Sequence, residues 1–147
     1  MIINRSAPGA TVVPILVYED VDQAVDWLCG TFGFKERLRA GRPGAPTSHA
    51  QLQIGDAAVM LGREGAEFRR PRPDEVNQYV VVHVADVDQH FARARERGAR
   101  IVNTPVDMPF GERQYSVQDI GGHRWTFSQS IADVALEAWG ARAAPER

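Results

Sequence analysis

Histidine side chains are the groups in this sequence best suited to proton chemistry. The chain has four of them, and an imidazole can donate or accept a proton near neutral pH. His83 stands alone in a run of valines and His49 opens a strand-like run, so each is either a ligand-contacting residue or a hydrogen-bonded core residue. His90 falls in a helical pattern and His123 beside a turn, so we expect both to have structural roles.

Tyrosine and arginine side chains add candidates for binding. We expect Tyr79 and Tyr115 to form walls of a site, and Arg113 either to pair with an anionic ligand or to lie exposed on a hairpin. The single cysteine, Cys29, has no partner at metal-ligand spacing and is expected to be a buried thiol. The sequence contains no Ser-His-Asp or Cys-His arrangement, phosphate-binding glycine loop or nucleotide fingerprint.

Composition limits the classes of protein to which the chain can belong. With 147 residues and 44% hydrophobic content, the chain suits one domain, which can hold two half-size modules. The net charge of -2 gives no basic surface, so neither nucleic acid nor an anionic membrane is an expected partner. The pattern of residues indicates no signal peptide or membrane span, which predicts a cytoplasmic protein.

The segment Asp-Val-Asp-Gln occurs at residues 20–23 and again at 86–89, each time after a β-prone run. Aspartate followed by glutamine three residues later approximates a capping box, which predicts that a helix begins at each copy. An apolar stripe at helical spacing follows both caps, and the glycines at 33 and 98 end the two helices. The repeated cap, stripe and stop indicate that one structural unit is written twice.

Strand patterns follow both helices and complete two βαβββ modules. We expect one domain, 1–147, with modules at about 12–62 and 78–129, a charged linker at 63–77 and a C-terminal helical tail at 130–147. The fold class is therefore α+β. In the tail, a short helix is expected to end at Gly140.

These modules resemble the vicinal oxygen chelate superfamily, which includes glyoxalase I, bleomycin resistance proteins, fosfomycin resistance proteins and extradiol dioxygenases. The resemblance rests on VVPILVYEDVDQAVDWLCGTFGFKE, on YVVVHVADVDQHFARARERGARIVNTP and on the hairpin QYSVQDIGGHRWTF. It implies that the modules form a cupped mixed sheet, the glyoxalase/bleomycin resistance fold, and that the protein is a homodimer. It specifies the fold and leaves the reaction open, because one scaffold supports different chemistry.

The resemblance also implies three positions for metal ligands, in the first strand of each module and after the last turn. In this sequence they are Val13, Tyr79 and Thr126. Valine has no donor atom, and neutral hydroxyls are poor substitutes for His or Glu. We therefore expect no metal and no other cofactor.

If those positions face the cup, strand alternation places further side chains there and sends Trp125 and Phe127 to the core. The expected ligand-binding residues are Tyr79, His83, His49, Gln51, Arg113, Tyr115, Arg124 and Thr126. The sequence alone does not fix which face of its strand carries Gln51, or which carries Arg113 and Tyr115.

Two functions remain open at this point. The preferred one is a metal-independent binding protein similar to the bleomycin resistance branch, which holds an aromatic or partly apolar small molecule in a resistance or ligand-sequestering role. The alternative is a metal-dependent lyase, isomerase or dioxygenase with a relocated metal site, for example at His49 and His83. Whether the protein is an enzyme is left open.

Overall fold

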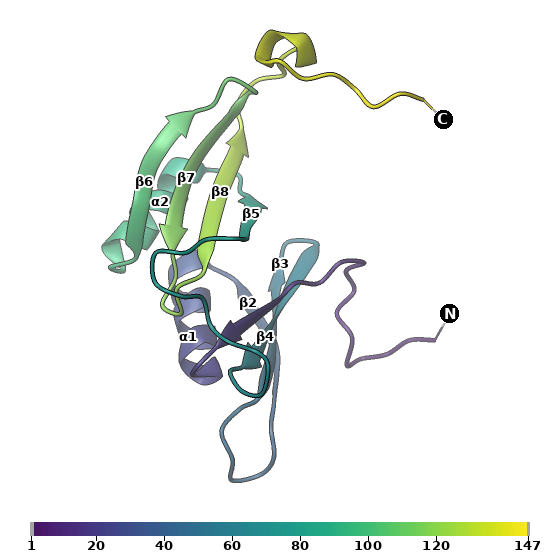
Figure 1. Cartoon of the computed structure of the whole chain (residues 1–147), viewed down its shortest axis with the longest axis vertical. Helices are drawn as coiled ribbons and strands as arrows, with labels where there is room; N and C mark the ends of the chain where they lie inside the picture. Colours follow the sequence, from purple (N-terminus) through teal and green to yellow (C-terminus); the bar gives the residue numbers. More distant parts are fainter. Residues whose placement is uncertain (1, 147) are drawn as a thin grey trace. The chain divides into compact units, whose positions relative to one another are not determined.

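The computed structural model describes residues 2–146 and divides into two compact units (Figure 1). The N-terminal unit comprises residues up to 77 together with 119–123, and the C-terminal unit comprises 78–118 and the chain from 124 onward. Each unit contains one α-helix and one four-stranded mixed sheet. The predicted α+β class and the two βαβββ modules are thereby confirmed.

The N-terminal unit has strand order β1-β4-β3-β2, with β1 parallel to β4 and the other pairs antiparallel. A β-bulge between Glu36 and Leu38 interrupts the pairing of β2 with β3. The elements of this unit are β1 (Ile15–Tyr18), α1 (Val21–Phe32), β2 (Lys35–Ala40), β3 (His49–Ile54) and β4 (Ala57–Arg63).

The C-terminal unit repeats this arrangement with strand order β5-β8-β7-β6, and β5 is parallel to β8. The β7 and β8 strands form a hairpin in which Tyr115 lies opposite Phe127 and Gln118 opposite Arg124. The elements are β5 (Tyr79–His83), α2 (Val87–Glu96), β6 (Arg100–Asp107), β7 (Glu112–Gln118), β8 (Arg124–Ser130) and the 3-10 turn η1 (Leu136–Trp139).

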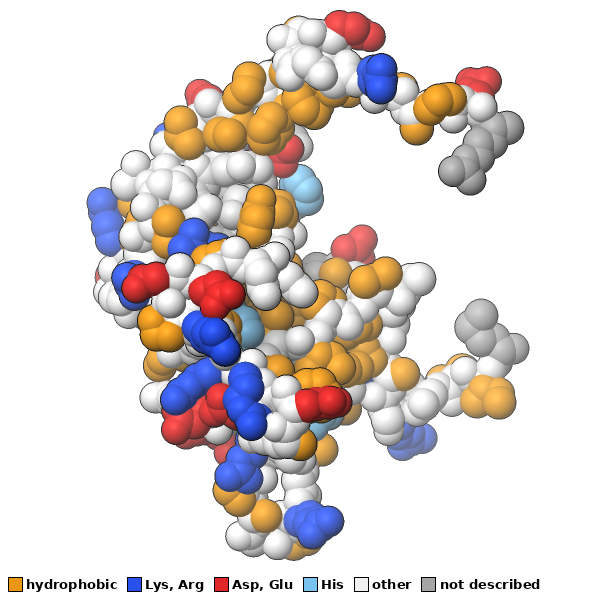
Figure 2. All heavy atoms as spheres, viewed as in Figure 1, with side chains coloured by type: hydrophobic (Ala, Val, Ile, Leu, Met, Phe, Trp, Pro, Cys, Tyr) orange, Lys and Arg blue, Asp and Glu red, His pale blue; other side chains and the backbone are white. Residues whose placement is uncertain are grey.

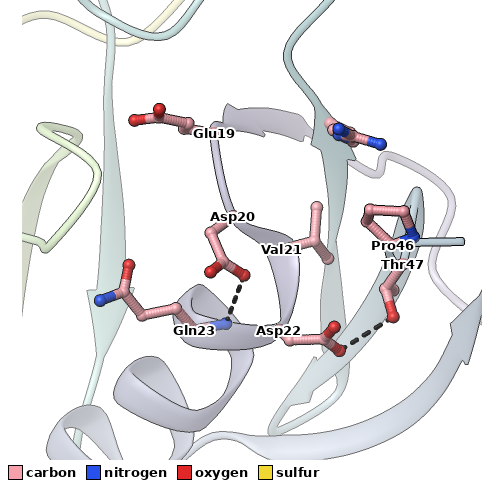
Figure 3. A pocket seen from close by; sticks show the side chains of 8 residues that line it. Glu19, Asp20, Val21, Asp22, Gln23, Pro46 and Thr47 are labelled. Carbon is pink, nitrogen blue, oxygen red and sulfur yellow. Dashed lines mark hydrogen bonds between the residues drawn. The ribbon is translucent and has the colours of Figure 1, made fainter.

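Both helices begin at the predicted caps. The Asp20 side chain accepts a hydrogen bond from the Gln23 backbone N–H at 3.0 Å, as Figure 3 shows. Asp86 accepts one from the Gln89 N–H at the same distance. Such bonds satisfy backbone donors that a helix leaves unpaired in its first turn. At the other end of α1, Gly33 has φ 80°, a conformation that glycine adopts without strain.

Each helix covers one face of its own sheet. In the N-terminal unit α1 packs on β3 and β4, burying Leu28, Leu52 and Leu61. In the C-terminal unit α2 packs on β6, β7 and β8, where Trp125 and Phe127 are fully buried as predicted. Burying one such side chain contributes roughly 1.5–3 kcal/mol. Among the described residues, the opposite face of each sheet carries no helix of its own unit, and we call it the helix-free face.

The β6 strand and the C-terminal tail depart from regular strand and helix patterns. The β6 strand continues through Pro105 to Asp107, which an edge strand tolerates because it has a neighbour on one side only. The expected C-terminal helix is reduced to η1, which Gly140 ends at φ 88°. A segment this short cannot sustain an isolated α-helix, and Trp139 of η1 instead lies 5.5 Å from the Phe110 ring. No helix within residues 2–146 is long and apolar enough to cross a membrane.

Candidate functional site

Strand register decides which side chains share the helix-free face of the β5-β8-β7-β6 sheet. Val81 lies opposite Thr126, His83 opposite Ser128, and Ser128 opposite Gln114. Directly opposed residues point to the same side, and alternate residues along a strand do so too. This face therefore carries Tyr79, Val81, His83, Gln114, Ser116, Arg124, Thr126 and Ser128, and Glu112 reaches into it.

A polar cluster forms at the His83 end of this face. The Ser128 hydroxyl donates to Glu112 Oε1 at 2.6 Å, and His83 Nδ1 lies 3.7 Å from the same oxygen. Gln114 Nε2 donates to Ser128 Oγ at 3.4 Å. Because the serine hydroxyl donates to the carboxylate and not to the imidazole, the arrangement does not activate a nucleophile. The imidazole lies near the carboxylate without a direct hydrogen bond to it, and its side chain is 68% exposed and available to a ligand.

The opposite end of the face is aromatic and cationic. Tyr79 is 60% exposed, and Arg124 lies directly opposite it in the register. Arg124 Nε is buried and has no hydrogen-bond partner among the described residues. A buried donor without a partner is costly and uncommon, so its presence calls for an acceptor. Between the two ends, the Thr126 hydroxyl bonds to Ser116 Oγ at 2.8 Å and is already satisfied.

The positions at which the resemblance implies metal ligands do not suit a divalent metal. Val13 offers no donor, and the Thr126 hydroxyl is engaged by Ser116. Tyr79 alone is an inadequate ligand set, because such sites need several His, Cys, Asp or Glu donors at about 2.0–2.3 Å from zinc. Within residues 2–146, no three such side chains are grouped so that they could hold a metal ion.

Two of the predicted binding residues lie on the other face of the same sheet, beneath α2. Arg113 pairs with Asp88 at 3.0 Å and with Asp107 at 2.9 Å, and these bonds raise the pKa of its guanidinium. Tyr115 is fully buried, and its hydroxyl lies 2.6 Å from His90 Nδ1. Burial raises the pKa of Tyr115 above its ordinary value. Both side chains have structural partners on the α2 side of the sheet.

The remaining histidines have the structural roles expected of them. The His90 ring packs on Phe127, with centroids 3.9 Å apart. His123 follows the β7–β8 turn, and its Nε2 lies 2.7 Å from the Val17 carbonyl oxygen within the N-terminal unit. In the same unit the buried Tyr18 hydroxyl donates to Asp119 at 2.5 Å. Burial, and secondarily the Asp119 charge, raises the pKa of Tyr18 well above its ordinary value.

His49 and Gln51 lie on the helix-free face of the first sheet, where Gln51 is opposite Met60 and Met60 opposite Ile15. His49 Nε2 lies 3.2 Å from Gln51 Nε2. The Gln51 side-chain amide also donates to the Ser6 carbonyl oxygen of the N-terminal segment. Gln51 is only 2% exposed. The structure thus brings these two predicted residues together, and it groups Tyr79, His83, Arg124 and Thr126 separately on the second sheet.

A hollow of about 500 Å³ lies at the start of α1. Figure 3 shows the side chains that line it. Its acidic side chains already have partners: Asp20 caps the helix, and Asp22 accepts from Arg39 and Thr47. The bond to Arg39, followed by the bond to Thr47, lowers the pKa of Asp22. No predicted site residue lines this hollow, and its contacts are those of a capped helix end.

Comparison with known proteins gives consistent matches. The family model described as the Glyoxalase/Bleomycin resistance protein/Dioxygenase superfamily matches residues 10–127. The uncharacterized protein Mb0911c of Mycobacterium bovis is 31% identical over 130 residues, which are 84% of this chain and 86% of that protein.

Solved structures agree with the family match. The crystal structure of TioX from Micromonospora sp. ML1 has a TM-score of 0.70 and 39% identity, covering 84% of this chain and all (100%) of that one. A glyoxalase/bleomycin resistance protein/dioxygenase from Nocardioides has a TM-score of 0.67 and 16% identity, covering 94% of this chain and 91% of that one. At that identity the second likeness shows a shared fold alone.

Proposed function

The chain belongs to the glyoxalase/bleomycin resistance protein/dioxygenase superfamily, and on that premise we propose that it is a metal-independent small-molecule-binding protein. The resemblance to the vicinal oxygen chelate superfamily is confirmed by these matches. The proposed ligand is aromatic or partly apolar and lies on the helix-free face of the β5-β8-β7-β6 sheet. Its binding would serve resistance to, or sequestration of, that molecule.

The observation that carries this proposal is Arg124 Nε, which has no hydrogen-bond partner within residues 2–146 and lies opposite an exposed tyrosine. Tyr79 and Val81 offer an apolar surface, and Arg124 offers a buried donor directly opposite Tyr79. Binding sites for small molecules are commonly built this way, from apolar walls with a few placed polar groups. A ligand with an aromatic body and a hydrogen-bond acceptor would fill both requirements at once.

The distance along β5 limits the size of that ligand. Tyr79 and His83 are four residues apart in one strand, which corresponds to roughly 13 Å at about 3.3 Å per residue. A molecule of roughly two or three aromatic rings with polar substituents spans most of this length. Its far end would then meet the exposed His83 imidazole.

Metal-free binding is proposed because the implied ligand positions hold Val13, Tyr79 and Thr126, which do not form a donor set. Within the part of the chain that the structure describes, His49 is near Gln51 and His83 near Glu112. Neither pair amounts to three donors. The metal content of the purified protein distinguishes this proposal from the metal-dependent alternative.

The proposal is tested with 8-anilinonaphthalene-1-sulfonate, a fluorescent probe with an aromatic body and an anionic acceptor. We expect Tyr79→Ala to weaken binding at least about fivefold, roughly 1 kcal/mol, and Arg124→Lys, which keeps the charge but removes Nε, to weaken it as well. Phe68→Ala is the matched control, since Phe68 is 57% exposed and lies in the other unit. Equal affinity in all four proteins, with unchanged thermal melts, would contradict the proposal.

We also propose that the protein is a homodimer, because members of this superfamily often form dimers. Hydrophobic side chains gather on the surface of the C-terminal unit near the end of β6 and the start of β7 (Figure 2). Exposed apolar residues there include Val106, Ile131 and Leu136. Sedimentation equilibrium should give twice the chain mass, and a single-chain mass at micromolar concentration would contradict this. The cytoplasmic location stays a prediction, to be tested by cell fractionation.

A further inference from the structure

The N-terminal segment folds into a tight turn at residues 4–7. The Ala7 N–H donates to the Asn4 carbonyl oxygen at 3.1 Å, and the Ser6 N–H donates to Asn4 Oδ1 at 3.0 Å. The side chains of these residues are exposed. The turn therefore presents its backbone, and not its side chains, to the rest of the N-terminal unit.

Three successive backbone carbonyls of this segment meet two side chains of the first sheet. Arg37 Nη2 donates to the Arg5 oxygen at 2.6 Å and to the Ala7 oxygen at 3.1 Å. Gln51 Nε2 donates to the Ser6 oxygen at 2.9 Å. Arg37 Nη1 in turn donates to Gln51 Oε1, which fixes the two donor groups relative to each other. Arg37 and Gln51 thus act together as a receptor for closely spaced carbonyl oxygens.

The two sides of this contact differ in burial and in secondary structure. Gln51 lies within β3, is 2% exposed, and has its amide flanked by His49. The occupant, by contrast, is an exposed segment without helix or strand, and such segments open more readily than buried ones. Its bonds to the sheet use only atoms that every peptide possesses. Another molecule with similarly spaced carbonyls offers the same acceptors.

We propose that Arg37 and Gln51 form a second ligand site, specific for peptide-like molecules with closely spaced amide carbonyls, and that the N-terminal turn occupies this site until such a molecule displaces it. The site lies on the helix-free face of the first sheet and shares no residue with the aromatic site proposed above. The inference therefore stands independently of that function.

Intramolecular occupation has a measurable consequence. A short tether holds the turn at a high effective concentration, typically millimolar for a flexible linker. The apparent affinity for an external ligand is lowered by the fraction of molecules in which the site is occupied. Solutes with a single carbonyl are excluded, whereas a ligand that offers several carbonyls at once can compete.

The test weakens the turn without shortening the chain. In the double variant Asn4→Ala, Ala7→Pro, the first change removes the Oδ1 acceptor and the second removes the N–H that closes the turn. Proline at 7 also drives residue 6 toward extended backbone, so its carbonyl leaves Gln51. Ile3→Pro is the matched control, since Ile3 is 97% exposed and precedes the turn.

The probe is N-acetyl-alanyl-alanine amide, with binding followed by NMR through the backbone amide signals of β3, which every variant retains. We expect the double variant to bind at least tenfold more tightly than the parent and the Ile3→Pro control. Adding either Gln51→Leu or Arg37→Met to the double variant should abolish binding of the probe. Arg37 is exposed, so its substitution should leave the fold intact, and thermal melts check that both triple variants remain folded. The proposal would be overturned by any of three results. These are equal affinity of the parent and the double variant for the probe, no binding of the probe to any of the proteins, and binding that survives Arg37→Met in a folded protein.

Discussion

Replacing Trp125 by alanine tests the assignment of faces on which the aromatic site depends. Trp125 is fully buried on the α2 side of β8, and its ring is stacked near Phe127. Its neighbour Thr126 points to the helix-free face with Tyr79 and Arg124. If Trp125 were exposed, the two faces would be exchanged and the proposed site would lie under the helix.

The expected loss of stability follows from the buried surface. An aromatic side chain of this size buries roughly 200 Å² or more, and alanine recovers only a fraction of it. At about 25 cal/mol per Å² of apolar surface, together with the cavity left behind, the loss is roughly 3–5 kcal/mol. For a chain of this length, that corresponds to a fall in melting temperature of roughly 6–20 °C. Urea unfolding followed by circular dichroism measures the free energy directly.

Trp139→Ala is the matched control for this experiment. Trp139 lies in η1, is 41% exposed, and has a ring contact with Phe110. We expect its loss to cost about 1 kcal/mol or less, since surface substitutions are usually mild. A Trp125→Ala protein as stable as the Trp139→Ala protein would refute the assignment of faces.

Two further predictions concern the caps and the buried tyrosines. Asp20→Ala and Asp86→Ala should each cost about 1 kcal/mol in denaturant unfolding, because each removes one equivalent capping bond of 3.0 Å; a twofold or larger difference between them would contradict the repeat. Burial raises the pKa of Tyr18, with a contribution from Asp119, and that of Tyr115. Since the unfolded value is about 10, the stability contributed by the neutral phenols is complete below pH 10 and is lost as pH rises above it. The free energy of unfolding should therefore fall as pH rises above about 10. Tyr115→Phe should make this fall with pH less steep, and an equally steep fall in the variant would contradict the raised pKa of Tyr115.

Local signals in the sequence predicted the elements well. The repeated Asp-Val-Asp-Gln segment located both helix starts. Strand alternation placed Tyr79, His83 and Thr126 on one face of the sheet and Trp125 on the other. These features depend on residues close in sequence, whose geometry is set by the helix and strand periods. The same local rules failed at the chain end, where a helical pattern too short to be stable yields only η1.

Features that depend on pairing between distant segments were not predicted. The positions of Arg113 and Tyr115 follow from the β7–β8 register, and counting outward from the 119–123 turn would have placed Tyr115 opposite the core residue Phe127. Glu112 was missed because its approach to His83 crosses two strand pairings. The hydrogen bond between Gln51 and the N-terminal segment was not predicted, because an exposed segment without periodicity gives no indication of its contacts.

The metal content of the purified protein tests most directly the claim that its site works without a metal. After extensive dialysis, elemental analysis should find far less than one equivalent of zinc, nickel, manganese or iron per chain, because Val13, Tyr79 and Thr126 supply no donor set. The same dialysed protein should still bind the naphthalene probe. One metal ion per chain in the parent, lost in His49→Ala or His83→Ala, would contradict the account and favour a metal-dependent enzyme.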